Sequence, residues 1–202
     1  MDINAVFERI LRLARLDTTV FDEVKDDERE LVPAIVVAAV SFLLAGIGAW
    51  LWWIMIPADF YSDEVEGQFI NNAILGTIFG IVVYGVAILI VYVVLAQAFR
   101  VQSDLQSLAR TMGYAAIPMA LSLLMLIPFL WPVFALVPLG LLLVMMIYAA
   151  QAASGADGTQ ATIAAVSGFA VFVLILSAIG LSNELPDVPM GVGQFGVLVD
   201  LN

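Results

Sequence analysis

The stretch FRVQSDLQSLARTMGYAAIP, Phe99–Pro118, is a charged island in a chain that otherwise consists of long apolar runs. Its apolar residues recur on one face of a helix, and Ser103–Gln106 has the S-x-x-Q form of a capping box. We therefore expect a short interfacial helix that begins at Ser103, lies at the membrane boundary and leads into a membrane span. Pro118 lies inside that span and should kink it, because proline removes a backbone hydrogen bond.

The composition of the whole chain is that of a helical membrane protein. Of its 202 residues, 63% are hydrophobic and 12% are charged, and the mean hydropathy is +1.06. Soluble domains have about half apolar and about a quarter charged residues. Long apolar runs indicate helices, whereas a barrel would show short alternating segments. The predicted fold class is therefore an all-α integral membrane protein.

The uncharged runs locate the membrane spans, since a helix needs about 20 apolar residues to cross a bilayer. One run, Thr111–Ala156, is much longer than the others and contains Pro128 and Trp131-Pro132, where a chain turns easily. We predict two helices in that run. This gives five spans, at about 31–56, 71–97, 112–130, 133–152 and 161–181.

Charged segments flank the predicted membrane domain, residues 31–182. Within residues 1–30, Met1–Arg15 has apolar residues at helical spacing and predicts an amphipathic helix on the membrane surface or on the bundle. The segment Asp22–Glu30 is dense in charge, as expected of a solvated helix end or of an acidic docking surface. The tail, residues 183–202, is acidic.

Glycines in the predicted spans are candidates for close helix packing. A small-residue patch in the first span and a GxxxG pattern in the second permit backbones to approach closely. We expect such close contacts within the bundle in preference to a dimer interface. The candidate packing glycines are Gly46, Gly48, Gly76, Gly80, Gly85 and Gly168.

Basic residues and tryptophans predict the same orientation in the membrane. With the N-terminus inside, all seven basic residues fall in the inner segments, where lysine and arginine collect. The four tryptophans then fall at the outer boundary, which indoles prefer. We expect a protein of a prokaryotic plasma membrane, with a cytoplasmic N-terminus and an external C-terminus.

Few of the usual catalytic and ligand-binding residues are present. The chain has no cysteine and no histidine, which removes thiolate chemistry and the commonest general base and metal ligand. One loop carries clustered carboxylates that could hold a divalent cation but lacks an EF-hand pattern: Asp59, Asp63, Glu64 and Glu66. We predict no catalytic, cofactor or metal site, and the net charge of −11 argues against nucleic-acid binding.

These observations favour a non-enzymatic membrane protein that acts as a scaffold or as an accessory subunit of a larger complex. No charged residue lies in the middle of a predicted span, whereas proton relays and many ion pathways use such residues. The expected partners are the lipid bilayer and other membrane proteins. The alternative is a transporter, channel or lipid-handling protein, because Pro118 and the glycines could break helices around a cavity. The sequence does not identify a small-molecule ligand.

The region that follows the island resembles a known family. Leu108-Ala-Arg110, Gly113-Tyr114 and Pro118 fit an L-x-R-x-x-G-Y-x-x-x-P pattern, and the segment FERILRLARLDTTVFDEV, Phe7–Val24, is similar to the same family's N-terminal region. The chain resembles the Yip domain family (Ypt/Rab-interacting proteins) in its bacterial form, over about residues 1–180. One departure is the linker before Leu108, which often carries a Gly-Gly or Lys-Gly turn in that family and here runs Arg100–Asp104.

The resemblance implies a five-helix membrane protein with a cytoplasmic N-terminus. Eukaryotic members bind small GTPases and partner membrane proteins in vesicle trafficking. In a prokaryotic chain this implies a role in membrane organisation or complex assembly. We expect Arg110 to reach water or to pair with Asp104 or with an acidic residue in Asp22–Glu30. The candidate anchoring and interaction residues are Arg100, Asp104, Arg110, Gly113, Tyr114 and Pro118.

Overall fold

The computed structural model describes residues 2–55, 69–127 and 129–181, and every regular element in these ranges is a helix. The elements before the second span are α1 (Ile3–Ala14), α2 (Val20–Val24), η1 (Glu28–Glu30) and α3 (Leu31–Met55). They are followed by η3 (Phe69–Leu75), α5 (Gly76–Val93), η4 (Val94–Ala98), α6 (Leu105–Ala115), η5 (Ile117–Leu126), α7 (Trp131–Ser154) and α8 (Gly158–Leu181). The predicted all-α membrane fold is confirmed.

Five helical stretches are long and apolar enough to cross a membrane, as predicted. They are Glu28–Trp52, Asn72–Ala98, Leu105–Leu126, Trp131–Ser154 and Gly158–Ala178. The third differs most from its predicted range of 112–130, because α6 is part of the span rather than a separate helix in front of it. The acidic loop 59–66 and the tail 183–202 lie outside the described residues.

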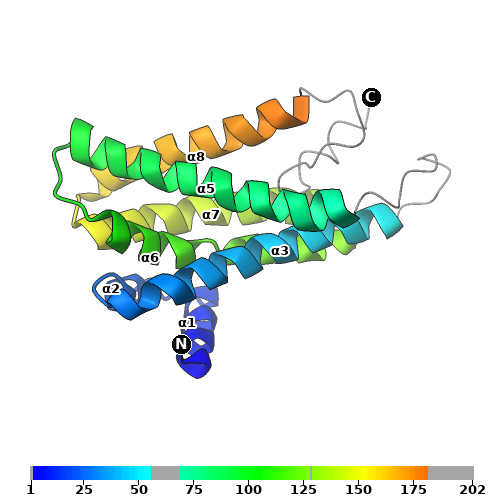
Figure 1. The fold of residues 1–202 in the computed structure, drawn as a ribbon, viewed down its shortest axis with the longest axis horizontal. Coiled ribbons are helices and arrows are strands. Elements are labelled where there is room, and N and C mark those ends of the chain that lie inside the picture. The colour runs from blue at the N-terminus through cyan, green and yellow to red at the C-terminus, as the bar shows by residue number, and fades with distance from the viewer. Residues whose placement is uncertain (1, 56–68, 128, 182–202) are drawn as a thin grey trace.

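The spans form one bundle (Figure 1), in which α6 and η5 contact α3 and α7, and α6 also contacts α5. On one side they pack against α3 and on the other against α7, while α5 packs against α8 and α3. The short helix α1 runs crosswise to the bundle (Figure 1). The charged island of the sequence therefore leads into the middle of the bundle and not along its surface.

The third span is the least apolar of the five and also the most buried. Most of α6 is inaccessible, including Leu108, Arg110 and every residue from Thr111 to Ala115. Polar groups are costly in contact with lipid, but they are tolerated where neighbouring helices supply hydrogen-bond partners. The low hydropathy of this span thus reflects its partners in the protein.

Local sequence explains how the third span begins and bends. Asp104, rather than the predicted Ser103, is the N-cap of α6, because its carboxylate accepts a hydrogen bond from the Ser107 N–H at 2.8 Å. The α-helix ends at Ala115, and Pro118 lies in the first turn of the 3-10 helix η5. Proline cannot donate to the carbonyl four residues earlier, so the chain tightens into 3-10 geometry instead.

One end of the bundle gathers α2, the C-termini of α5 and α7 and the N-termini of α6 and α8 (Figure 1). We call it the α2 end. At the opposite end, Trp52 and Trp131 stack edge to face with their ring centroids 5.7 Å apart, and Trp50 packs on Phe69 at 4.9 Å. The two ends thus differ in the same way as the two sides of a membrane protein, with charge at one and indoles at the other.

Some of the candidate packing glycines lie where helix backbones touch. A Cβ atom at Gly48 would lie 2.2 Å from the Ser122 carbonyl oxygen, one at Gly46 would lie 2.5 Å from that of Asn72, and one at Gly168 would lie 2.6 Å from that of Ala87. Gly76 and Gly80 are buried on α5. At Gly85 a Cβ would meet nothing within 4 Å.

Candidate functional site

The side chain of Arg110 is buried and binds the backbone of α2. It is only 5% exposed, and its Nε donates to the carbonyl oxygen of Lys25 at 3.0 Å, with a second hydrogen bond from Nη2 to the same oxygen. The Ser107 hydroxyl also donates to this oxygen, at 2.9 Å. Asp104 lies 3.8 Å from the Arg110 guanidinium. The main partner of Arg110 is therefore a carbonyl group and not an acidic side chain of Asp22–Glu30.

This contact caps the C-terminus of α2. A helix leaves its last carbonyls without partners inside the helix, and they carry partial negative charge, so a guanidinium is a favourable partner. The apolar side of α2, made by Val20, Phe21 and Val24, is fully buried, and α2 packs on α6 and α7. Apolar burial and the arginine cap together hold α2 on α6.

A second buried contact joins η1, directly before α3, to α6. The Tyr114 hydroxyl donates to Glu30 Oε2 at 2.7 Å, and Arg9 Nη1 lies 2.7 Å from Glu30 Oε1. Both Tyr114 and Glu30 are buried. We call Ser107, Arg110 and Tyr114, with the Lys25 carbonyl and Glu30 that they bind, the α6 polar cluster. It joins α2, η1 and α6, and Arg9 extends it to α1.

The turn between α1 and α2 is held by Arg12. Its guanidinium donates to Asp17 at 2.8 Å, to Glu23 at 3.0 Å and to Thr19 at 2.9 Å. Hydrogen bonds from Thr19 and from Arg12 hold the pKa of Asp17 below its ordinary value, because they stabilise the charged carboxylate. Leu16 takes a left-handed φ of 63° where α1 ends. The two N-terminal helices therefore form one unit.

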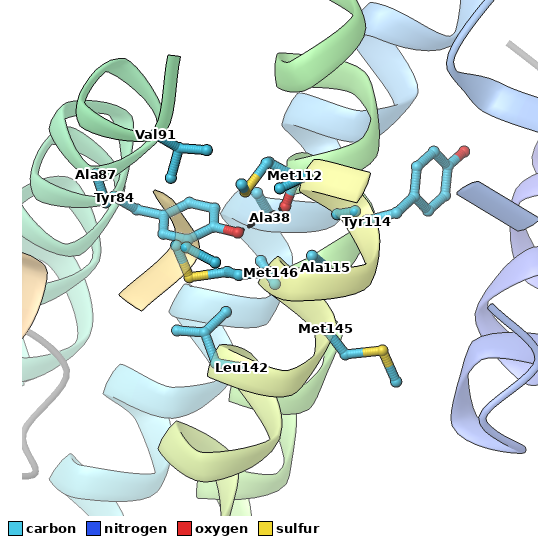
Figure 2. Close-up of a cluster of buried hydrophobic side chains, with 14 of the residues drawn as sticks. Ala38, Tyr84, Ala87, Val91, Met112, Tyr114, Ala115, Leu142, Met145 and Met146 are labelled. Atoms are coloured by element: carbon cyan, nitrogen blue, oxygen red, sulfur yellow. Dashed lines mark hydrogen bonds between the residues drawn. The ribbon is translucent and has the colours of Figure 1, made fainter. Parts of the chain in front are cut away.

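Further buried contacts fix α6 to α5 and α3. Figure 2 shows Tyr84 of α5 pointing into the apolar core with its hydroxyl on the Met112 carbonyl, at 2.7 Å, whereas Tyr114 points away toward the N-terminal helices. Gly113 lies against α3, where a Cβ atom would be 2.6 Å from the Ala34 carbonyl oxygen and 2.7 Å from the Ala34 Cβ. The helix α6 is thus fixed on three sides.

The predicted site residues do not all lie in one cluster. Asp104, Arg110, Gly113 and Tyr114 lie on α6 or cap it, and Pro118 is buried just beyond it. Arg100 is exposed in the linker and takes a left-handed φ of 55°, a conformation that favours glycine. This is the linker in which the resemblance leads one to expect glycine.

The sequence does not identify the partners of α6. Glu30 is one of several acidic residues in a charge-dense segment, Tyr84 lies in an apolar span without a distinguishing pattern, and the acceptor at Lys25 is a backbone oxygen, which has no signature in a sequence. Among the described residues, no group of three or more acidic side chains could hold a metal ion. The α6 polar cluster holds helices together, and its groups are engaged with one another.

The family model described as "Yip1 domain" matches residues 17–181. The chain belongs to the Yip1 domain family. The resemblance noted at Leu108–Pro118 is thereby confirmed, and the Yip1 domain match starts at the turn that leads into α2. Neither a curated protein nor a solved structure matches the chain.

The Yip1 domain match includes α2 and its buried contacts. The matched region includes α2, all five candidate spans and the whole α6 polar cluster, but it leaves out α1. The short helix α2 is therefore a part of the Yip1 domain and not a tail in front of it.

Proposed function

We propose that this Yip1 domain protein is a non-enzymatic membrane scaffold or an accessory subunit, which presents its N-terminal helices to partner proteins. The observation that supports this is the way α2 is held. Its inner side is buried and capped by Arg110, while its outer side and the segment after it are exposed. A surface fixed in this way is suited to binding, because little order has to be gained when a partner docks.

The exposed surface is strongly acidic. Five carboxylates lie uncovered between the start of α2 and η1, namely Asp22, Glu23, Asp26, Asp27 and Glu28. Complementary charge speeds association and selects partners. The partner that suits this surface is a protein with a basic patch, at the membrane boundary or on its soluble side.

We further propose that the α2 end faces the cytoplasm of a prokaryotic cell. The basic residues near this end and the tryptophans at the other support the orientation, since lysine and arginine favour the cytoplasmic side. The bilayer and other membrane proteins are then the partners of the bundle, and the acidic surface is open to the cytoplasm.

The absence of cysteine from the sequence makes the orientation easy to test. In whole cells, a membrane-impermeant maleimide is expected to label Phe129→Cys, whose position is 91% exposed between η5 and α7. Asp26→Cys should be labelled only after the membrane is permeabilised. Labelling of Asp26→Cys in intact cells would reverse the proposed orientation.

The scaffold role is tested by crosslinking in native membranes, followed by mass spectrometry. The double variant Asp26→Lys/Glu28→Lys is expected to lose most of the crosslinks that the wild-type chain forms through α2 and η1. Both side chains are exposed, so the fold should be unchanged.

Glu8→Lys is the matched control, because Glu8 is exposed on α1 and carries the same charge. It should keep the crosslinks of the wild type. A wild-type crosslink pattern in the double variant would refute the acidic docking surface. A protein that forms no crosslinks to other proteins in its native membrane would refute the scaffold role.

A further inference from the structure

A surface cleft lies at the α2 end, between α2 and the last turns of α7. It has a volume of about 410 Å³, with Thr18, Asp22 and Lys25 on one wall and Tyr148, Gln151 and Gly155 on the other. A smaller cleft of about 190 Å³ is lined by Leu16, Thr18, Val144, Met145 and Tyr148. Thr18 and Tyr148 line both clefts, which therefore adjoin, and we call the two together the groove.

The groove changes from polar to apolar along α7. Its outer part contains the ion pair and Gln151, and its inner part contains Val144 and Met145. From Gly155 back to Val144 it follows α7 for roughly 16 Å, at about 1.5 Å per residue. Since α7 is a candidate span, the groove leads from the end of the bundle toward the middle of the membrane.

The outer part of the groove offers charges of both signs. Lys25 Nζ and Asp22 Oδ1 lie 2.9 Å apart, and the two side chains are 30% and 62% exposed. The C-terminus of α7, which ends at Ser154, adds partial negative charge to the same place. A ligand that fits here carries an anionic and a cationic group next to each other.

We infer that this groove binds one phospholipid of the adjoining leaflet, with a zwitterionic headgroup that contains a phosphate and a primary amine. The phosphate accepts hydrogen bonds from Lys25, and the ammonium faces Asp22 and the end of α7. One acyl chain follows the inner part of the groove, over Val144 and Met145. This lipid site adjoins the acidic surface proposed for protein partners and shares Asp22 with it.

Three features of the groove select this occupant. The apolar inner part suits an acyl chain and not a soluble phosphate compound, because a small polar ligand would leave Val144 and Met145 uncovered. An anionic headgroup without an amine would leave Asp22 facing negative charge. A quaternary amine would fit the charges but could donate no hydrogen bond to the carboxylate.

The experiment is native mass spectrometry of the full chain in detergent, with added lipids that share the same acyl chains. Phosphatidylethanolamine is expected to bind at least about fivefold more tightly than phosphatidylglycerol or phosphatidylcholine, since hydrogen bonds to charged groups are among the stronger ones. Glycerophosphoethanolamine, the headgroup without chains, should not compete.

Variants locate the site. Lys25→Gln and Asp22→Asn should each remove the preference for phosphatidylethanolamine, and Val144→Trp, which fills the inner groove, should lower binding about tenfold. The matched controls are Arg15→Gln, which removes an exposed positive charge on the same segment, and Val137→Trp, which places the same ring about two turns away on α7. Both controls should bind lipid as the wild type does.

Three results would overturn the inference. Equal binding of the three lipids would remove the headgroup preference. Wild-type binding by Val144→Trp would place the lipid elsewhere. Competition by the free headgroup would identify a soluble ligand instead of a bilayer lipid.

Discussion

Replacement of Arg110 by alanine is expected to destabilise the fold by about 3 kcal/mol, because hydrogen bonds from charged groups contribute about 1.5–3 kcal/mol each. Arg110 is buried and donates both of its hydrogen bonds to the Lys25 carbonyl, so its loss leaves only the neutral Ser107 hydroxyl on this oxygen at the end of α2. The loss of structure should be confined to α2 at first. We expect α2 to separate from α6 before the bundle unfolds, since α2 is only one short helix.

Two measurements check this expectation. Hydrogen exchange should become faster in Val20–Lys25 of Arg110→Ala while the α7 amides stay protected, and thermal unfolding in detergent should begin earlier. Arg110→Lys should be intermediate, because an ammonium carries the charge but not the planar fork of donors. Arg100→Gln is the control, since Arg100 is exposed. Unchanged exchange in α2 would contradict the role assigned to Arg110.

Gly113→Ala is expected to cost about 3 kcal/mol, at the upper end of what overpacking costs in a tight core. The added methyl group would lie 2.6 Å from the Ala34 carbonyl oxygen, and backbone cannot move aside as a side chain can. Gly48→Ala should have a comparable effect, because its methyl group would lie 2.2 Å from the Ser122 carbonyl oxygen. Both changes force α3 away from the third span.

The matched control is Gly85→Ala, which adds the same methyl group where nothing lies within 4 Å. Alanine favours a helix over glycine by up to about 1 kcal/mol, so this variant should be as stable as the wild type or more stable. Thermal unfolding of the three variants in one detergent gives the comparison. Equal stability of Gly113→Ala and Gly85→Ala would show that the contact between α6 and α3 is not as close as described.

Comparison of these glycines shows what a sequence pattern can and cannot say. Gly48 and Gly85 both lie in apolar spans, and small residues in spans predict close packing in each case. The structure brings a neighbouring backbone against Gly48 only. The identity of the residue permits the approach, but the neighbour depends on how the spans are arranged around one another.

In the α6 polar cluster, too, the helix arrangement decides which neighbour a residue contacts. The sequence predicts a helix at the charged island and a link between Arg110 and either Asp104 or the charged segment before the first span. The structure has the Asp104 carboxylate 3.8 Å from the Arg110 guanidinium and adds a carbonyl oxygen, which every residue has, as the hydrogen-bond acceptor. The predicted surface helix becomes the central one, because α2 covers the side that would otherwise meet water.

The sequence by itself determined the class of protein, the five spans and the family. These depend on local properties: the length of an apolar run against the thickness of a bilayer, and a short motif at Leu108–Pro118. Only the tertiary structure decided what the charged island does. Its partner, the Lys25 carbonyl, lies 82 residues before Ser107 in the chain, and the groove beside α2 needs α7 as its second wall. Contacts between distant segments follow from how the helices pack, and no local pattern encodes that arrangement.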